Sequence, residues 1–491
     1  MSEKPLFGLR LATGNSRKLE QAQKTLPKDI TLSVIKPLFN EDEIKDRLDV
    51  PLTRGIEYVG ALSREKFLVQ RKKEKESAKK EEDDFTLICS DSVVLFEKDG
   101  RQIALNRNAT DKQKAEAITA INRDKEITFV GATTFGWRDG ISALTIATYL
   151  KVPLKSEIKA LPFEIDNLPN MVTKEGFEIG FIDFEMDRKK GEFKLKFKRK
   201  DETKDFDRAR PFISGNASEV WAFIKSTSLF EKKHSCVLQE VIEESPFNTL
   251  VFYANYSSSG QSLKDFYTAL VNDRHDFFSQ YGGNCSFFSL ELADRLHSLN
   301  PQVVIYPSLR PEDKNGHSSL LVNKEGYRFV FDPGLSIPFP IPLSEDISLF
   351  PFYSSGKWIL AGVGDLDKKD RIPDLIILRK KGKKVPLIGR RVSSVDEFRE
   401  KMPEILQGLH EKRDHIKMDF HNGSGMKVLG IAYSRKSKKL EIKSEKEIIF
   451  NGSLGDFLSD SSFTIKGICD QKNLPYDVII EQLQSLLLYL E

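Results

Sequence analysis

Three short segments in the second half of the chain carry a cysteine, a histidine and an aspartate, in that order. Cys285 follows the run Gly282-Gly283-Asn284, His317 precedes an apolar stretch, and Asp332 follows one. A thiol is a strong nucleophile only as a thiolate. A nearby imidazole lowers its pKa, and a carboxylate on the other ring nitrogen orients that imidazole. Because the three residues are far apart in sequence, a site of this kind requires a fold that joins all three segments.

The pattern around each residue predicts an element that begins or ends at the site. Residues 286–297 carry apolar side chains at helical spacing, so we expect Cys285 at a helix N-terminus, where the backbone dipole favours a thiolate. His317 opens an apolar strand, and Asp332 closes the strand 327–331. Each feature alone is ordinary, since a lone cysteine is usually a buried apolar residue and Asp-Pro-Gly is a common turn. Their order favours a catalytic triad.

These motifs resemble those of the arylamine N-acetyltransferases. The matching patterns are Gly-Gly-x-Cys ending at Cys285, His-x-x-Leu-Leu-Val from His317 and Asp-x-Gly from Asp332, with weaker matches at 246–250 and 338–343. The resemblance implies a cysteine-proteinase-like C-terminal domain, helical plus a β-barrel, and acetyl-coenzyme A as the acyl donor. His317 would act as general base, Cys285 would carry the acyl group as a thioester, and an amine would be the acceptor.

Two positions depart from that family's pattern. Tyr281 stands where the family has arginine before the two glycines, and Pro333 after Asp332 resembles the wider transglutaminase-like superfamily. Cys-His-Asp sites in that superfamily also serve peptidases and amidases. A cysteine peptidase or amidase, with water as the acceptor, therefore stays open beside the acyltransferase.

Length and composition bound the number of domains and the classes of partner. The 491 residues suffice for two or three domains, and a charged stretch at 231–245 predicts a boundary between domains at 1–230 and 236–491. Charged residues make up 30% of the chain, but the formal net charge is +3, so no basic field favours nucleic acid or an anionic membrane. Four cysteines without paired spacing, no leader-like start and no long apolar run predict a cytoplasmic protein.

The first half alternates strand and helix patterns, which predicts an α/β (α+β) fold. A strand at 7–13 is followed by a turn and by a helix from residue 16. Backbone N–H groups at such a helix start attract phosphate, and basic side chains add charge. We therefore expect four residues to contact a phosphate: Thr13, Asn15, Arg17 and Lys18.

Acidic and basic residues further along the chain extend this phosphate site. Glu43 lies in a segment that we expect to be a loop, Lys66 on a helix, and Asp91 on a strongly apolar strand. Carboxylates near a phosphate are best explained by Mg²⁺, which takes oxygen ligands and bridges them to phosphate. The carboxylates in this pattern therefore predict a Mg²⁺ site beside the phosphate.

This arrangement resembles the superfamily of inosine triphosphate pyrophosphatases and Maf nucleotide pyrophosphatases, over about residues 7–150. Thr-Gly-Asn-x-x-Lys at 13–18 matches the first group, whereas Asp-Glu at 42–43, Arg-Glu-Lys ending at Lys66 and Ser-Asp-Ser-Val-Val around Asp91 match Maf. The resemblance implies release of pyrophosphate from a nucleoside triphosphate. It also implies that Glu43 would help to hold the metal, that Lys66 would contact phosphate, and that Asp91 would bind metal or activate the attacking water.

Departures from the Maf pattern keep other functions open. The Maf opening Ser-x-Ser-Pro-Arg-Arg is missing, and Ala-Leu-Asn-Arg at 104–107 replaces Gly-Lys-Pro, with Arg107 as the candidate cation. The N-terminal half could therefore be the main activity, as nucleotide clean-up, or a non-catalytic nucleotide-binding domain. A nucleotide-linked substrate shared between the two halves is a further hypothesis, motivated by both motif sets occurring in one chain.

Three patterns outside the two sites predict further elements. Residues 181–197 alternate apolar and charged residues around Lys-Lys-Gly, which is typical of a β-hairpin. Residues 427–449 have the pattern of two or three strands, and 476–490 that of a closing amphipathic helix.

Overall fold

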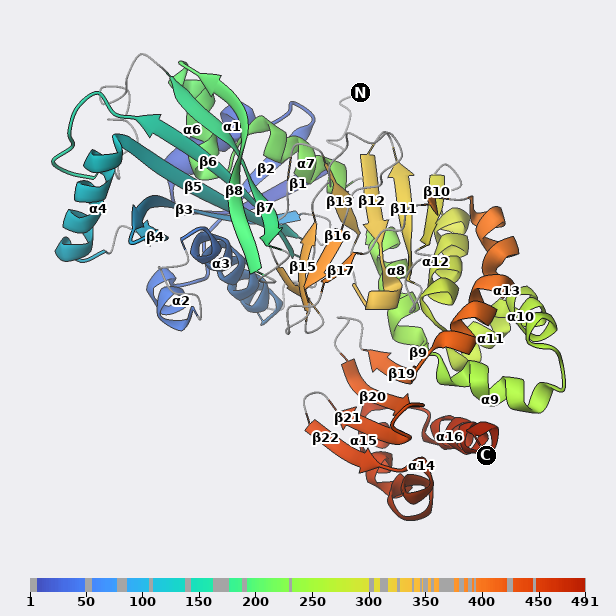
Figure 1. The fold of residues 1–491 in the computed structure, drawn as a ribbon. Helices are drawn as coiled ribbons and strands as arrows, with labels where there is room; N and C mark the ends of the chain where they lie inside the picture. Colours follow the sequence, from blue (N-terminus) through green and yellow to red (C-terminus); the bar gives the residue numbers. More distant parts are fainter. Residues whose placement is uncertain are drawn as a thin grey trace.

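The described residues form four β-sheets with helices packed on them (Figure 1). No helix among these residues is both long enough and apolar enough to pass through a lipid bilayer. The computed structural model describes residues 7–48, 55–76, 86–105, 109–136, 143–161, 176–187, 192–228, 232–299, 304–309, 317–324, 327–337, 340–344, 347, 352–354, 357–361, 375–378, 384–386, 391–392, 394–421, 427–444 and 447–490.

The N-terminal half is built on an 8-stranded sheet in the order β2-β1-β3-β5-β6-β7-β8, with β4 paired to β3. β1 pairs in parallel with β2 and β3, and the other pairs are antiparallel. The expected hairpin is the pair β7–β8. The elements are β1 (Phe7–Ala12), α1 (Ser16–Thr25), β2 (Ile30–Ile35), α2 (Glu41–Arg47), α3 (Ile56–Glu76), β3 (Thr86–Lys98), β4 (Arg101–Leu105), α4 (Asp111–Asp124), β5 (Glu126–Gly136), β6 (Ala143–Pro153), β7 (Phe177–Asp187), β8 (Glu192–Thr203), α6 (Phe206–Ser214) and α7 (Ser218–Ser228).

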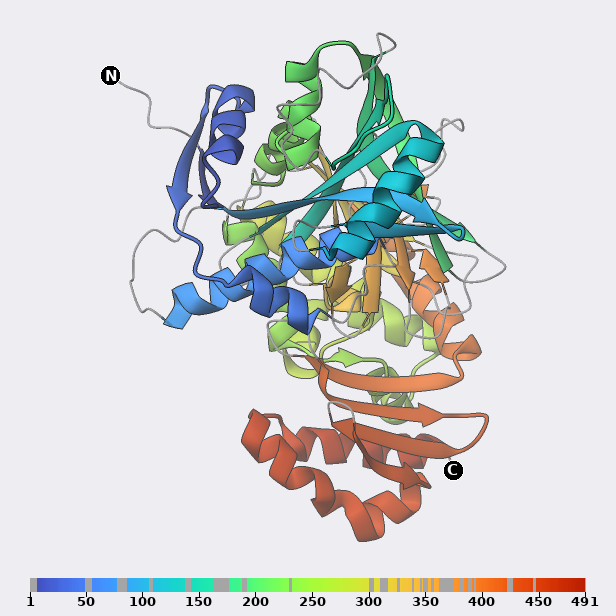
Figure 2. The ribbon, with the colours of Figure 1, turned by 90° about the vertical axis from the view of Figure 1, so that its left-hand side faces the viewer.

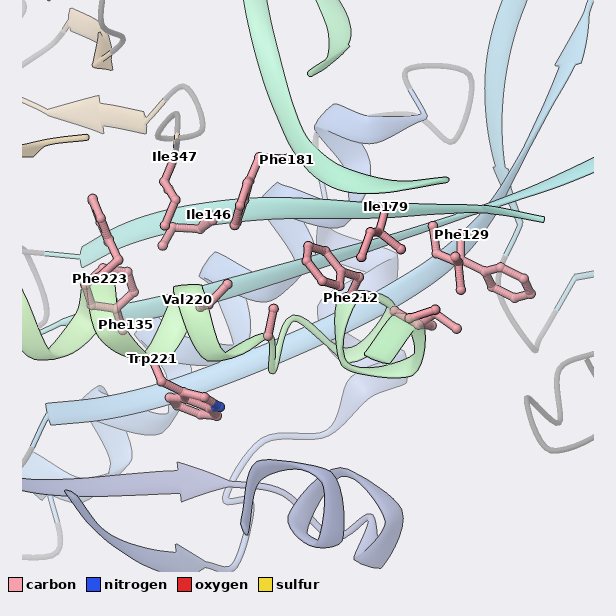
Figure 3. Packing of buried hydrophobic residues seen from close by; sticks show 14 of the residues in the cluster. Phe129, Phe135, Ile146, Ile179, Phe181, Phe212, Val220, Trp221, Phe223 and Ile347 are labelled. Atoms are coloured by element: carbon pink, nitrogen blue, oxygen red, sulfur yellow. The ribbon is translucent and has the colours of Figure 1, made fainter. Parts of the chain in front are cut away.

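Helices cover both faces of this sheet, which explains why its central strands β3, β5 and β6 are buried at most positions. On the α3 face, Val130 of β5 belongs to the same buried cluster as Val59. On the other face, the neighbouring Phe129 clusters with Phe212 of α6 and Trp221 of α7 (Figure 3). Alternate residues of one strand therefore supply two separate cores.

The acidic segment that we expected to be a loop is the helix α2, so that prediction is wrong. The Asn40 side chain caps this helix and accepts a hydrogen bond from the Asp42 N–H at 3.1 Å. Acidic residues in a first turn are favoured by the helix dipole. Apolar periodicity did not indicate the helix because Ile44 is the buried residue of this short, acidic run.

The C-terminal half combines helices with two antiparallel sheets, ordered β13-β12-β11-β10-β18 and β14-β15-β16-β17. Among the described strands, β13 and β18 at the edges of the first sheet do not pair with each other, and neither do β14 and β17 at the edges of the second. Both sheets are therefore open, and the expected β-barrel is not formed by these strands. The elements are α8 (Lys232–Glu244), α9 (Leu250–Ser259), α10 (Leu263–Asn272), α11 (Arg274–Tyr281), α12 (Cys285–Leu299), β10 (Val304–Leu309), β11 (Ser318–Lys324), β12 (Tyr327–Phe331), η3 (Pro333–Leu335), β13 (Ile341–Leu343), β14 (Phe352–Ser354), β15 (Lys357–Ala361), β16 (Leu375–Leu378), β17 (Lys384–Pro386), β18 (Arg391–Val392) and α13 (Val395–Lys412).

A further sheet follows α13, with strand order β22-β21-β20-β19-β9 and helices α14 to α16 packed on it. Figure 2 shows this unit in red at the bottom of the molecule, with the N-terminal sheet at the top. Its strands β20 to β22 and its last helix confirm the elements predicted near the C-terminus. The elements are β9 (Phe247–Asn248), β19 (His415–His421), β20 (Lys427–Ser434), β21 (Lys439–Ser444), β22 (Glu447–Gly452), α14 (Leu454–Asp456), α15 (Lys466–Lys472) and α16 (Tyr476–Leu490).

The sheet that contains β11 and β12 joins the two halves. Leu320 belongs to the buried cluster of the C-terminal helices, whereas the next residue, Leu321, clusters with Val330 and the N-terminal strands. Figure 3 shows Ile347, from the C-terminal half, beside Ile146 of β6. The two halves therefore share one hydrophobic core. The predicted division into residues 1–230 and 236–491 stays a prediction.

Candidate active site

Glycine geometry fixes the turn that precedes Cys285. Gly282 has a φ of +73°, and a Cβ atom there would lie 2.0 Å from the carbonyl oxygen of Pro246. The Gly283 N–H donates to that carbonyl at 3.3 Å, and the Gly283 carbonyl accepts from the Asn248 N–H at 2.7 Å. Because only glycine fits at residue 282, the chain enters the following helix in one orientation.

Cys285 is the first residue of α12, as the sequence predicts. The side chain of Asn284 caps this helix and accepts hydrogen bonds from the backbone N–H groups of Ser286, at 3.0 Å, and Phe287, at 3.2 Å. The sulfur therefore lies at the positive end of a helix dipole, which favours a thiolate. Cys285 is 4% exposed.

The pairing of β11 with β12 brings His317 and Asp332 together. The strands are antiparallel, with Leu320 opposite Phe331, so the residue before β11 and the residue after β12 lie at the same end of the pair. His317 Nε2 and Asp332 Oδ2 are 2.7 Å apart. Asp332 is fully buried, and its other oxygen accepts a hydrogen bond from the Leu335 N–H at 3.0 Å.

A hydrogen bond between the Cys285 thiol and the His317 ring completes a continuous chain to Asp332. Burial alone would raise the pKa of Cys285, but the hydrogen bond and charge of His317, with the backbone N–H of Ser318, hold that pKa below its usual value. Burial would lower the pKa of His317, but the Asp332 carboxylate and Cys285 raise it to about 10. Both shifts favour a thiolate beside an imidazolium over a neutral thiol beside a neutral imidazole.

In the N-terminal half, Lys66 lies between two carboxylates. Its Nζ is 2.6 Å from Asp91 Oδ2 and also bonds to Glu41, and Lys18 Nζ donates to the Ser90 carbonyl at 2.9 Å. Burial would lower the pKa of Lys66, but Asp91 and Glu41 raise it above its usual value. Burial would raise the pKa of Asp91, but Lys66 and Lys18 lower it. Two lysine side chains and two carboxylates therefore form one charged network, in which burial lowers the pKa of Lys18.

The metal pair expected from the sequence does not form in this cluster. Glu43 is exposed, and its carboxylate accepts a hydrogen bond from the Asn40 side chain at 3.3 Å. Glu41, from the same acidic segment, lies beside Lys66 instead. Over the described ranges, no group of three or more His, Cys, Asp or Glu side chains could hold a metal ion.

Of the four residues expected to contact phosphate, Lys18 lies in the charged network. Thr13 and Asn15 instead shape the start of α1: Thr13 Oγ1 accepts from the Asn15 N–H at 3.1 Å, and Asn15 Oδ1 accepts from the Arg17 N–H at 3.0 Å. The Arg17 side chain is exposed. Arg107 lies outside the described residues.

Comparison with known proteins finds weak structural likenesses. The chain matches no protein-family model and no curated protein. An arylamine N-acetyltransferase C from Bacillus anthracis is 13% identical, over 49% of this chain and 90% of that one, with a TM-score of 0.33. An arylamine N-acetyltransferase from Bacillus cereus, which has a Cys-His-Glu catalytic triad, is 9% identical over 46% and 89%, with a TM-score of 0.31. These TM-scores carry no argument about function.

Proposed function

We propose that the C-terminal half is a thiol-dependent acyltransferase with a ping-pong mechanism. The observation that supports this proposal is the hydrogen-bonded chain from Cys285 through His317 to the buried Asp332. A cysteine at a helix N-terminus, paired with an imidazolium, is an activated nucleophile. The same residues carry the sequence resemblance to the arylamine N-acetyltransferases.

In the first step the Cys285 thiolate attacks the carbonyl carbon of the acyl donor. The bond between that carbon and the donor's leaving group breaks, and the imidazolium of His317 gives its proton to the leaving group. The acyl group is then a thioester on Cys285. Asp332 holds the His317 ring in place and stabilises its protonated form.

In the second step the acceptor attacks the thioester. Neutral His317 takes the proton of the incoming amine, the carbon–sulfur bond breaks, and the thiolate of Cys285 is restored beside the imidazolium. We propose an acetyl thioester such as acetyl-coenzyme A as the donor and an amine as the acceptor, both by resemblance. With water as the acceptor, the same residues would give a peptidase or amidase.

Mass spectrometry of the whole chain and of its peptides after incubation with acetyl-coenzyme A tests the proposal. We expect an acetyl adduct on Cys285 that disappears when an arylamine is added, and that is absent from Cys285→Ser. Cys236→Ser is the matched control, because Cys236 is a partly exposed cysteine of α8. Failure of Cys285 to accept acetyl, combined with cleavage of peptide or amide substrates, would favour the hydrolase.

The charged network in the N-terminal half supports a second candidate function, nucleotide binding or hydrolysis. Lys18 and Lys66 are cations of the kind that contact phosphate, and Lys66 is 2% exposed. Glu41 and Asp91 have oxygen ligands suited to Mg²⁺, but both already bond to Lys66, so the pair does not fit a metal held by protein side chains. We therefore derive no step through a metal.

Pyrophosphate release from a panel of nucleoside triphosphates, with and without Mg²⁺, tests this second candidate. Hydrolysis that is lost in Asp91→Asn would support a nucleotide pyrophosphatase. Nucleotide binding without release of pyrophosphate would support a non-catalytic nucleotide-binding domain. If the N-terminal half neither binds nor hydrolyses nucleotides, its role would be to support the sheet of β11 and β12, with which it shares a hydrophobic core.

A further inference from the structure

Three serine hydroxyls form a buried chain next to Cys285, the proposed nucleophile. Ser318 Oγ donates to Ser286 Oγ at 3.3 Å, and Ser289 Oγ lies 3.3 Å from Ser318 Oγ. Ser286 is 2% exposed, and Ser289 and Ser318 are fully buried. The proposed reaction uses none of these hydroxyls.

The chain connects the two elements that carry the reacting groups. Ser286 and Ser289 lie on α12, which begins at Cys285, whereas Ser318 is the residue after His317 and begins β11. The backbone N–H of Ser318 donates a hydrogen bond to the Cys285 sulfur. The backbone of Ser318 therefore hydrogen-bonds to Cys285, and its side chain hydrogen-bonds to α12, the helix that begins at Cys285.

Packing alone does not require hydroxyl groups at this interface. Apolar residues of the same two elements pack together: Leu290 of α12 and Leu320 of β11 belong to one buried cluster. A buried hydroxyl costs free energy unless it is hydrogen-bonded, so alanine would fill these positions without that cost. What serine adds is direction, because each hydrogen bond fixes the spacing between helix and strand.

We infer that Ser318 is a positioning residue for the nucleophile: its hydroxyl, held by Ser286 and Ser289, keeps its backbone N–H on the sulfur of Cys285. This inference rests on the proposed function, since it assigns the serines to the activation of the same thiol. The N–H stabilises the thiolate more than the thiol, because hydrogen bonds to a charged acceptor are the stronger ones. Loosening the serine chain should therefore make the thiol less acidic.

The pH dependence of Cys285 alkylation by iodoacetamide, measured peptide by peptide in the full chain, tests the inference. For Ser318→Ala we expect the midpoint of the rate profile to move up by about half to one pH unit, or three- to tenfold slower alkylation below the midpoint. Ser289→Ala removes the hydroxyl beyond Ser318 and should move the midpoint in the same direction. Ser63→Ala is the matched control.

Ser63 is a fully buried serine of the N-terminal half, whose hydroxyl bonds to the Cys89 carbonyl at 3.0 Å. We expect Ser63→Ala, like Ser318→Ala and Ser289→Ala, to lower the melting temperature, because each removes a buried hydrogen bond. Unlike those two variants, Ser63→Ala should keep the wild-type pH profile of Cys285 alkylation. If Ser318→Ala does not fold, Ser289→Ala provides the test. Profiles of the folded serine variants that coincide with the wild type would overturn the inference and leave the acyltransferase standing. A wild-type thiol that titrates like free cysteine would instead overturn the proposed function.

Discussion

The negative charge of Asp332 is buried at the end of β12 and is balanced by the His317 ring. In Asp332→Asn the shape stays but the charge goes, so the raised pKa of His317 falls and the thiolate of Cys285 loses its partner. We expect acyl transfer to drop by about 10³- to 10⁴-fold, with the alkylation midpoint moving to higher pH. Asp419→Asn, which removes a carboxylate bonded to Lys427, is the control and should keep full activity. Wild-type rates in Asp332→Asn would contradict the role given to this carboxylate.

A second residue, His410, is expected to make stability depend on pH. It is buried, with Nδ1 2.8 Å from the Tyr267 hydroxyl and Nε2 3.3 Å from that of Tyr489. Burial, and then the charge of Arg435, lower its pKa to about 4 from 6.5. The unfolded chain therefore binds more protons between these values. The stability held by neutral His410 is complete above pH 6.5 and is lost as the pH falls towards 4.

The expected loss attributable to His410 is at most about 2 kcal/mol between pH 7.5 and 5. Urea unfolding of His410→Gln, which cannot take up a proton, should show a smaller fall of the unfolding free energy over that interval than the wild type does. The exposed His415 provides the matched control, because His415→Gln makes the same change of residue type away from the buried site. Equal slopes for His410→Gln and wild type would argue that His410 binds protons equally in the folded and the unfolded chain.

At the scale of elements, local pattern was sufficient where an element's own residues determine it. The predicted helix 286–297 is α12 (Cys285–Leu299), the predicted strand 327–331 is β12, and the predicted helix 476–490 is α16. Apolar periodicity reports which face of an element is buried, so it predicts the element even when the elements packed against it are unknown. The helix α2 has one buried apolar residue, and its available sequence signal was the Asn40 cap followed by Glu43.

Contacts between elements were predictable only in part. The ordered motifs gave grounds for expecting that Cys285, His317 and Asp332 converge, and the structure places them together. No local pattern indicated that Glu41 of α2 would bond to Lys66 of α3, because that contact depends on how the two helices pack. The pairing of sheet edges also depends on how elements pack, which no local pattern reports. The resemblance implied a β-barrel, whereas the described strands form open sheets.

The turn η3, which follows Asp332, depends on a glycine. A Cβ atom at Gly334 would lie 2.5 Å from the Cβ and 2.9 Å from the Cα of Cys285, so the turn or Cys285 must move in Gly334→Ala. We expect a loss of about 1–3 kcal/mol in stability, and at least a tenfold loss of Cys285 alkylation at pH 7. In Gly408→Ala on α13 the new methyl meets nothing within 4 Å, and both quantities should stay at or above wild type. Unchanged alkylation in Gly334→Ala would show that the turn can yield without disturbing the site.

Across the whole chain, the sheet that carries His317 and Asp332 is buried on both faces. The run from Ser318 to Val322 is buried at every position, a pattern of strands covered from two sides. The consecutive apolar residues Leu320 and Leu321 were visible in the sequence, but what covers the second face was not. The structure places the N-terminal half there. The strand that starts beside His317 is therefore supported by residues of both halves.

This shared core predicts that the two halves unfold together. Leu321→Ala removes packing towards the N-terminal half, and we expect it to cost about 2–5 kcal/mol and to accelerate hydrogen exchange in N-terminal strands such as β6. Leu320→Ala should cost a similar amount, since Leu320 packs among the C-terminal helices.

If the halves form one cooperative unit, calorimetry of each variant shows a single transition at a lower temperature. Two transitions, of which each variant moves only the one on its own side, would mean that the core joins two independently stable domains. The His317 strand would then keep its position without the N-terminal half, and residues 236–491 alone should alkylate at Cys285 as fast as the full chain.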